Sequence, residues 1–148
     1  MGTRIVGYAA GAFDLFHVGH LNILRNARQH CDVLIAGVVS DEMLRTVKGV
    51  DPVVPEEERA EIVRHISFVD HVYIETKPAK MDAWHDLHFT RFFKGDDWRG
   101  TEKGLQLERD FASVGVEVVY FPYTAHTSST ALRRALDVLT RGELAVAQ

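Results

Sequence analysis

Two histidines near the start of the chain carry the most specific chemistry in the sequence. His17 and His20 lie three residues apart at a predicted helix start, with Gly19 between them. This spacing places both imidazoles on one side of the first helical turn. Imidazoles there can donate hydrogen bonds to phosphoryl oxygens as charge builds in a transition state. An ordinary helix start with two exposed histidines is the alternative, and an isolated H-x-x-H would favour it.

The segment before these histidines is typical of a phosphate site. It follows an apolar run and begins at Gly11, and Gly19 would let a bulky group approach the backbone closely. Free N–H groups and the helix dipole favour phosphate at such a helix start. Cys31 and the other histidines show no ligand spacing, so we expect no metal ion held by protein side chains.

Further along the chain, two basic residues stand where cations could meet phosphate. Lys48 lies in a loop beside Gly49, where a flexible cation could move over phosphates, although most lysines are solvated surface residues. Arg59 falls in the first turn of a helix that begins near Pro55, which is unfavourable for the helix dipole. This cost suggests a phosphate contact, and a surface Glu–Arg pair is the alternative.

Two later segments add polar groups. Asp96 and Asp97 follow a predicted strand and could bind Mg²⁺ or hydroxyl groups, or form a turn and cap. Trp98 could pack over the loop or stack on a substrate or a partner subunit. Ser128-Ser129-Thr130 offers hydroxyls and N–H groups at a last helix start, and no Glu or Gln completes a capping box there.

The elements that must position these residues alternate along the chain. Apolar runs predict strands at 5–10, 33–39, 72–74, 89–94 and 116–121. Helices are predicted at 18–29, after an N-cap at Ser40, from Pro55, and from Ser128 to Leu139 with an end near Gly142. This rhythm predicts one α/β domain over residues 1–148, a Rossmann-like doubly wound fold with a five-stranded parallel sheet. Ligands bind such sheets at the carboxyl ends of the strands.

Composition excludes several classes of protein. Apolar residues make up 46% and charged residues 26% of 148 residues, and the formal net charge is −4. This balance gives no general attraction to nucleic acid or to a membrane. The longest apolar run is too short to span a bilayer and no signal peptide is evident, so we expect a cytoplasmic protein.

The motifs together resemble the HxGH nucleotidyltransferase superfamily, and within it the cytidylyltransferases, particularly the glycerol-3-phosphate type. The resemblance runs from Val6 to about Leu136. Residues 11–20 are similar to G-T-F-D-L-x-H-x-G-H, with Ala12 in place of Thr. The matching pieces are Ser40-Asp41-Glu42 with Lys48-Gly49, Pro55 to Arg59, Val69-Asp70, Gly95-Asp96-Asp97-Trp98 with Gly100, and Thr127-Ser128-Ser129-Thr130.

This resemblance implies that CTP and an alcohol phosphate such as glycerol 3-phosphate react to give a CDP-alcohol and pyrophosphate. No covalent enzyme intermediate is expected, and Mg²⁺ would enter with the nucleotide phosphates, near Asp96. Catalytic roles are implied for His17, His20 and Lys48. Nucleotide contacts are implied for Gly11, Ala12, Phe13, Asp14, Gly19, Thr124, Thr127, Ser128, Ser129 and Thr130. Acceptor contacts are implied for Asp14, Lys48, Arg59, Lys80, Asp96, Asp97 and Trp98. A homodimer is also expected; Phe92, Phe93, Trp98 or Tyr123 could contribute to its contact, or the same aromatic residues could belong to the core.

The sequence departs from the family pattern at three basic positions. Tyr123 replaces an arginine before the closing motif, Ser67-Phe68 replaces another before Val69, and Val50 replaces a second lysine. His126 or Arg133 could take the place of the first guanidinium. Two other functions stay open: an adenylyltransferase of the same fold acting on a sugar or flavin phosphate, and a nucleotide-binding module without catalysis.

Overall fold

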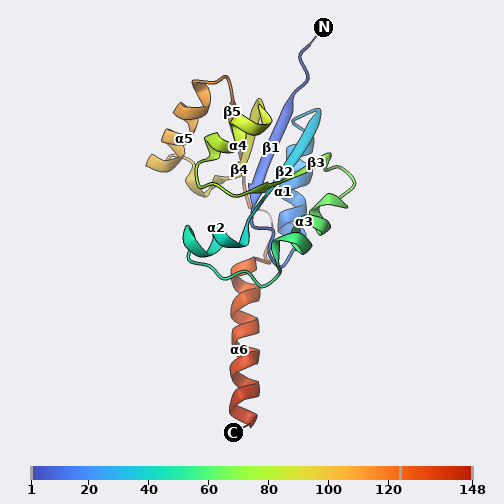
Figure 1. Ribbon diagram of the computed structural model, residues 1–148, viewed down its shortest axis with the longest axis vertical. Helices are drawn as coiled ribbons and strands as arrows, with labels where there is room; N and C mark the ends of the chain where they lie inside the picture. Colours follow the sequence, from blue (N-terminus) through green and yellow to red (C-terminus); the bar gives the residue numbers. More distant parts are fainter. Residues whose placement is uncertain (1, 124, 148) are drawn as a thin grey trace.

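A single parallel sheet organises the computed structural model, which describes residues 2–123 and 125–147, with side chains up to residue 142 (Figure 1). Its strand order is β3-β2-β1-β4-β5. The strands are β1 (Val6–Gly11), β2 (Val33–Val39), β3 (His71–Glu75), β4 (Arg91–Gly95) and β5 (Glu117–Phe121). Because β1 is followed by β2 on one side and has β4 on the other, the order reverses at β1. A doubly wound sheet binds ligands at this point, and the predicted fold class is confirmed.

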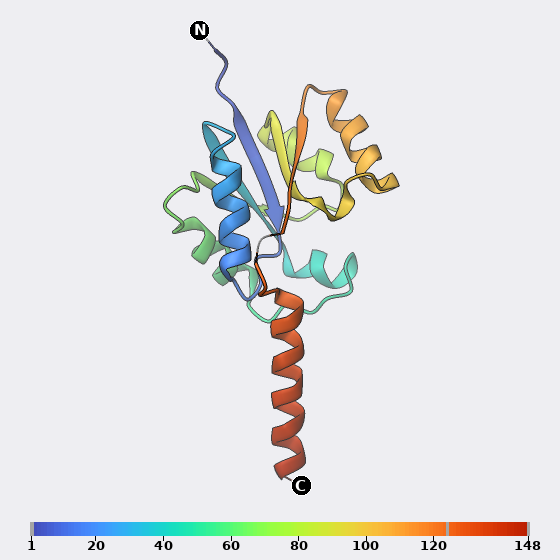
Figure 2. The ribbon, with the colours of Figure 1, turned by 180° about the vertical axis from the view of Figure 1, so that it is seen from behind.

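Helices cover both faces of the sheet. They are α1 (Val18–Arg28), α2 (Asp41–Thr46), α3 (Glu56–Arg64), α4 (Lys80–Leu87), α5 (Glu102–Ala112) and α6 (Ser129–Ala147), with a 3₁₀ turn η1 (Asp96–Trp98). Helices α1 and α3 lie on one face, and α4 and α5 lie on the other (Figures 1 and 2). The α6 helix extends away from the sheet at its carboxyl edge (Figure 2).

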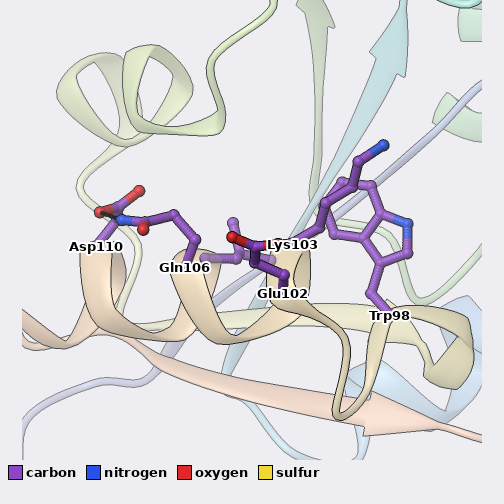
Figure 3. Close-up of a pocket in the computed structure, with 6 residues that line it drawn as sticks. Trp98, Glu102, Lys103, Gln106 and Asp110 are labelled. Atoms are coloured by element: carbon purple, nitrogen blue, oxygen red, sulfur yellow. Dashed lines mark hydrogen bonds between the residues drawn. The ribbon is translucent and has the colours of Figure 1, made fainter.

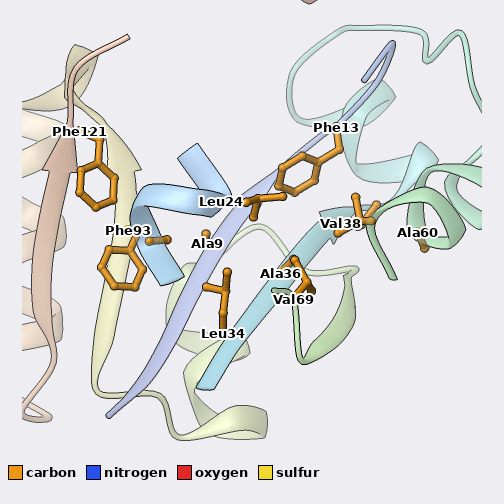
Figure 4. Packing of buried hydrophobic residues seen from close by; sticks show 12 residues of the cluster. Ala9, Phe13, Leu24, Leu34, Ala36, Val38, Ala60, Val69, Phe93 and Phe121 are labelled. Carbon is orange, nitrogen blue, oxygen red and sulfur yellow. The ribbon is translucent and has the colours of Figure 1, made fainter. Parts of the chain in front are cut away.

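Side chains along each strand point alternately to the two faces of the sheet, so the hydrophobic core has a cluster on each face. Ala9, Leu34 and Phe93 belong to the cluster beneath α1 and α3 (Figure 4). Their chain neighbours Tyr8 and Phe92 belong to the cluster beneath α4 and α5. Successive side chains on a strand point to opposite faces, so both faces of each central strand must be apolar. This explains the continuous apolar runs in the sequence.

Several predicted boundaries were wrong. The fourth strand was predicted at residues 89–94, but β4 starts at Arg91, and Phe89 packs in the core before the strand begins. The last helix was predicted to end near Gly142, but α6 continues to Ala147. One glycine costs a helix only about 1 kcal/mol and does not by itself end it. Phe92 and Phe93 are buried, so of the two roles considered for these aromatic residues, a dimer contact or the core, the structure shows the core for this pair.

Local sequence explains where the helices near the site begin. Ser40 caps α2 by accepting a hydrogen bond from the Met43 N–H, as predicted. Ser128 caps α6 by accepting a hydrogen bond from the Ala131 N–H at 3.1 Å. Both caps follow strands β2 and β5, so they bring helix N-termini to the carboxyl edge of the sheet. Within the described part of the chain, no helix is both long and apolar enough to cross a membrane.

Candidate active site

Two adjoining cavities lie at the carboxyl edge of the sheet. The central cavity, of about 400 Å³, lies between the loop after β1, Lys48, the end of β4, and Tyr123. A smaller cavity of about 180 Å³ lies between the start of α1 and the start of α6. His20, Ile23 and Tyr123 line both cavities. The site therefore spans the point where the strand order reverses.

The two histidines form one hydrogen-bonded unit at the start of α1. The Nδ1 atom of His17 accepts from the Gly19 N–H at 3.0 Å, and the Nδ1 atom of His20 accepts from the His17 N–H at 3.2 Å. Their ring centroids lie 4.0 Å apart. Since each Nδ1 is an acceptor, each neutral ring carries its proton on Nε2. Both Nε2 atoms lie 3.5 Å from the Ser129 hydroxyl oxygen at the start of α6.

Burial keeps both rings neutral. It lowers the pKa of His17, and burial together with the nearby His17 lowers the pKa of His20 to about 4. The site thus presents two uncharged N–H donors and a helix N-terminus to the same small volume. This arrangement can stabilise an oxyanion or a phosphoryl group through hydrogen bonds without taking up a proton.

The backbone around these histidines has special requirements. A Cβ atom at Gly19 would lie 2.7 Å from Cε1 of His17, so any other residue would displace that ring. We predicted that Gly19 leaves room for a ligand; here it leaves room for His17. Phe13 and Leu15 both have positive φ values, 53° and 54°. Such conformations cost of order 1–3 kcal/mol each and cluster at functional sites.

Asp14, between these two strained residues, is fully buried. Its carboxylate accepts hydrogen bonds from the N–H groups of Val53 and Val54 at 2.8 and 2.9 Å, and from the Arg133 guanidinium at 2.9 Å. Its carbonyl oxygen accepts from the Ser129 hydroxyl at 2.7 Å. Asp14 therefore joins the histidine loop to the segment after Lys48 and to α6, and its carboxylate lines neither cavity.

Arg59 is almost completely buried, although it is charged. Its Nε donates to the Val54 carbonyl at 2.8 Å, and its Nη1 donates to the carbonyls of Ala12 and Val39 at 2.6 and 2.8 Å. Its Nη2 pairs with the Asp41 carboxylate at 2.6 Å. The guanidinium fixes loops at the carboxyl edge and forms no surface pair with a glutamate.

Lys48 lines the central cavity, beside Gly49 with its positive φ of 64°. Burial and the nearby ammonium of Lys80 lower the pKa of Lys48, although Glu75 and Asp97 act in the opposite direction. A lysine that is partly desolvated and close to another cation has the electrostatics of an anion-binding group.

Lys80 is held at the start of α4 by a buried carboxylate. It forms an ion pair with Glu75 at the end of β3. Glu75 is 2% exposed and also accepts a hydrogen bond from the Tyr8 hydroxyl at 2.5 Å. The Tyr8 hydroxyl fits because Gly37 has no Cβ, which would lie 2.1 Å from it. Lys80 lines neither cavity, but its charge is close enough to lower the pKa of Lys48.

The end of β4 contributes a second group of side chains. The Lys94 ammonium lies 3.9 Å from the centroid of the Trp98 ring. The Tyr123 hydroxyl donates to Asp97 at 3.1 Å, and its ring crosses Gly95, where a Cβ would lie 2.3 Å from that hydroxyl. Burial and Asp97 raise the pKa of Tyr123 to about 12, so it remains a neutral donor. All but one of these residues were noted in the sequence; Lys94 was not.

The structure brings together most of the predicted site residues. The central cavity is lined by Gly11, Ala12, Phe13, His20, Lys48, Asp97 and Trp98. The smaller cavity is lined by His17, Gly19, His20, Thr127, Ser128 and Ser129. Neither cavity is lined by Asp14, Arg59, Lys80, Asp96 or Thr130. Thr124 lies outside the described residues. Sequence reasoning missed Lys94 and Ile23, although the position of Lys94 directly before Gly95, at the end of a strand, could have indicated it.

The described carboxylates near the site offer few ligands for a metal ion. Across residues 2–123 and 125–147, no three His, Cys, Asp or Glu side chains are grouped to hold a metal ion. Asp97 lines the central cavity, and one of its carboxylate oxygens already accepts from the Tyr123 hydroxyl. A single carboxylate suits Mg²⁺ that is bound chiefly by nucleotide phosphates, because Mg²⁺ keeps several of its waters and takes only one or two carboxylate ligands from a protein.

A parallel sheet, an HxGH helix start and a facing helix N-terminus define a nucleotidyltransferase-type enzyme, and the comparisons with known proteins agree. Residues 8–135 match the cytidylyltransferase-like family. The chain belongs to this family.

Relatives within the family have two different names. The FAD synthase of Pyrococcus abyssi is 44% identical over 121 residues, covering 81% of this chain and 82% of the relative. The FAD synthase of Thermococcus onnurineus is 36% identical over 117 residues, covering 78% and 77%. The bifunctional protein HldE of Hyphomonas neptunium is 33% identical over 128 residues, covering 86% of this chain but 26% of the relative. The chain thus spans about a quarter of that HldE, and the similarity does not single out the predicted glycerol-3-phosphate type.

Solved structures agree with the fold. A lipopolysaccharide core biosynthesis protein from Thermoplasma volcanium has a TM-score of 0.71 at 22% identity, covering 84% of this chain and all of that one. A pantoate-beta-alanine ligase from Francisella tularensis has a TM-score of 0.62 at 12% identity, covering 83% and 60%. At these identities the likeness shows the fold alone.

Proposed function

We propose that the protein transfers an adenylyl group from ATP to the phosphate of flavin mononucleotide, giving FAD and pyrophosphate. The observation that carries this proposal is the similarity to FAD synthases over most of both chains. The HldE similarity, by contrast, reaches a quarter of that longer relative. The central cavity supports the proposal, because Phe13, Trp98 and Tyr123 line it with aromatic side chains suited to a flat ring system.

In the proposed reaction, an oxygen of the flavin phosphate attacks the α-phosphorus of ATP. A new phosphorus–oxygen bond forms, the bond from the α-phosphorus to the bridging oxygen breaks, and pyrophosphate leaves with that electron pair. The acceptor phosphate is already ionised at neutral pH, so no general base is needed. The work of the protein is therefore positioning and charge stabilisation.

Different side chains would bind the triphosphate and balance its charge. His17 and His20 would donate their Nε2–H groups to the triphosphate, and Ser129 with the start of α6 would hold it from the other side. Lys48 would approach from the central cavity and balance negative charge near the α-phosphate. Asp97 would help to hold the Mg²⁺ that enters with the nucleotide, and the chemistry this ion would supply is neutralisation of charge on the leaving pyrophosphate.

Two related functions are second candidates. Transfer of an adenylyl group to a sugar phosphate is favoured by the HldE similarity, which extends over 86% of this chain. Transfer of a cytidylyl group to glycerol 3-phosphate or another alcohol phosphate is favoured by Gly95-Asp96-Asp97-Trp98, which resembles that branch. A homodimer and a cytoplasmic location also stay predictions.

A matrix of substrates separates these candidates. The purified protein would be mixed with ATP, CTP, GTP or UTP and with flavin mononucleotide, a sugar phosphate or glycerol 3-phosphate, in the presence of Mg²⁺. We expect pyrophosphate release and FAD formation with ATP and flavin mononucleotide. Turnover with CTP and glycerol 3-phosphate alone would restore the cytidylyltransferase prediction. Nucleotide binding without turnover for any pair would favour a module without catalysis.

A further inference from the structure

The cations around the site differ in whether a carboxylate neutralises them. Arg59 is paired with Asp41, Arg133 with Asp14, and Lys80 with Glu75. Each of these three thus has a structural role that occupies its charge. The predicted acceptor contacts of Arg59 and Lys80 would have to compete with these pairs. Other cations should therefore meet the acceptor phosphate.

Lys94 is one such cation. It lines the central cavity from β4, and no ion pair joins it to another described residue. Its ammonium lies over the Trp98 ring, 3.9 Å from the centroid, in a cation–π contact. This contact holds the ammonium in place without neutralising its charge. Lys94 is therefore positioned and still able to bind an anion.

The described lining of the central cavity carries more positive than negative charge, because Lys48 and Lys94 line it together with one carboxylate, that of Asp97. Burial lowers the pKa of Lys94, Asp97 acts in the opposite direction, and the ammonium groups of Lys80 and Lys48 lower it further. Lys48 and Lys94 share this half-buried cavity, and their mutual repulsion, together with that of the nearby paired Lys80, disfavours their charged forms. A bound dianion would remove this repulsion, which makes the cluster an anion site rather than a structural ion network.

The position of Lys94 indicates which phosphate it meets. His17 and Ser129, which face the triphosphate in the proposed function, line the smaller cavity, whereas Lys94 lines the central one. We infer that Lys94 binds the phosphate monoester of the acceptor. The Trp98 ring holds the Lys94 ammonium in place, and Lys48 lies between the acceptor and the nucleotide. The inference rests on the proposed function in one respect: it places the triphosphate at the smaller cavity and the acceptor in the central cavity. The ligand class is a phosphate monoester attached to an organic group.

A second lysine beside Trp98 provides a matched control. Lys103, on α5, lies 5.7 Å from the centroid of the same ring. It lines an open outer groove of about 420 Å³, together with Glu102, Gln106 and Asp110 (Figure 3). Lys103 does not line the central cavity. Replacing Lys103 therefore removes a positive charge near Trp98 without removing one from the proposed site.

The experiment compares phosphorylated and unphosphorylated acceptors by isothermal titration. Wild type, Lys94→Met, Lys94→Arg and Lys103→Met would each be titrated with flavin mononucleotide against riboflavin, and with glycerol 3-phosphate against glycerol. For Lys94→Met we expect about 10- to 100-fold weaker binding of the phosphorylated ligand, as expected for losing one charged hydrogen bond of about 1.5–3 kcal/mol. Binding of the unphosphorylated ligand should not change. Lys94→Arg should retain part of the affinity, and Lys103→Met should bind like wild type.

Other outcomes separate the inference from the proposed function. Unchanged affinity of Lys94→Met for both phosphorylated ligands would overturn the inference, as would an equal loss for riboflavin and flavin mononucleotide. If FAD is formed but flavin mononucleotide binds Lys94→Met normally, the inference fails and the proposed function stands. If no FAD is formed but glycerol 3-phosphate binding depends on Lys94, the proposed function fails and the inference stands.

Discussion

The carboxylate of Asp14 and the guanidinium of Arg133 meet at 2.9 Å across 119 positions of the chain. Asp14 belongs to the loop that ends at His17, and Arg133 lies in the second turn of α6. The same carboxylate also accepts from Val53 and Val54, in the segment that follows Lys48. One buried side chain therefore sets the relative positions of the histidines, the lysine loop and the helix that bears Ser129.

Replacing Asp14 by Asn should loosen all three segments. The substitution keeps the volume but removes the charge that three donors share, leaving Arg133 without its partner. Breaking a buried ion pair costs about 3–5 kcal/mol, and the low end applies because Arg133 is partly exposed. We expect urea unfolding to show a loss of about 3 kcal/mol, and trypsin to cleave faster at Lys48. The exposed neighbour Arg134 gives the control, since Arg134→Ala should change neither quantity; unchanged trypsin cleavage in Asp14→Asn would contradict the coupling.

His17→Ala should remove catalysis and keep the fold. One preorganised donor to a developing oxyanion is worth about 100- to 1,000-fold in rate. We therefore expect kcat for the best substrate pair to fall by that factor. The circular dichroism spectrum should stay close to wild type, and the free energy of unfolding should fall only by the cost of a lost helix cap, about 0.5–2 kcal/mol. The exposed His71 lies on the edge strand β3, away from the cavities, so His71→Ala should have normal activity. Activity within threefold of wild type in His17→Ala would remove the residue from the mechanism.

Gly19→Ala should also lower the activity, because its methyl group would displace the His17 ring. The added methyl group would meet the His17 ring at 2.7 Å, so the imidazole must turn and lose its hydrogen bond from the Gly19 N–H. We expect activity to fall at least tenfold, with the affinity for nucleotide less affected. Gly142→Ala is the matched control, because nothing lies within 4 Å of its added Cβ. That variant should be active and up to about 1 kcal/mol more stable, as alanine favours a helix interior. Equal activity of the two variants would refute this account of Gly19.

The lowered pKa of His20 predicts how the free energy of unfolding depends on pH. Its pKa is lowered to about 4 in the folded protein, mainly by burial, whereas an unfolded chain protonates histidine near about 6.5. Between these values the unfolded state binds a proton that the folded state does not, so the free energy of unfolding falls as the pH drops from about 6.5 towards 4. Urea titrations at several pH values should show this slope in wild type and a smaller slope in His20→Gln. The exposed His85 provides the control, and an identical slope in His20→Gln and His85→Gln would contradict the prediction.

The sequence predicted the sheet, and it indicated that His17 and His20 lie together at a helix start, because both features depend on local patterns. The β2 strand has the predicted bounds, since a run of seven apolar residues must be buried on both faces. The roles of Arg59 and Asp14 were harder to predict. Arg59 has partners 5, 18, 20 and 47 positions away, and no local pattern reports such contacts. Their family positions indicated a ligand, whereas the structure shows both side chains occupied by the protein itself.

Lys94 was missed for a related reason. A lysine at the end of an apolar run indicates that the strand reaches solvent there, so the pattern favours a solvated side chain. Its partner Trp98 lies four residues later, at the end of the η1 turn, and this turn follows Gly95, where the missing Cβ leaves room for the Tyr123 side chain from the neighbouring strand end. The sequence shows the two residues near each other but does not show that both face the central cavity.

The common direction of the five strands has a practical consequence. The first strand begins at the edge of the sheet remote from both cavities, and residues 2–5 leave the body there (Figure 1). Anything joined ahead of this segment, such as an affinity tag, a solid support or another folded module, would leave the mouth of the site open to incoming nucleotide. The opposite end of the chain leaves the body at the other edge, because α6 starts beside the histidines. Attachment through the first residues is therefore the arrangement that should preserve turnover.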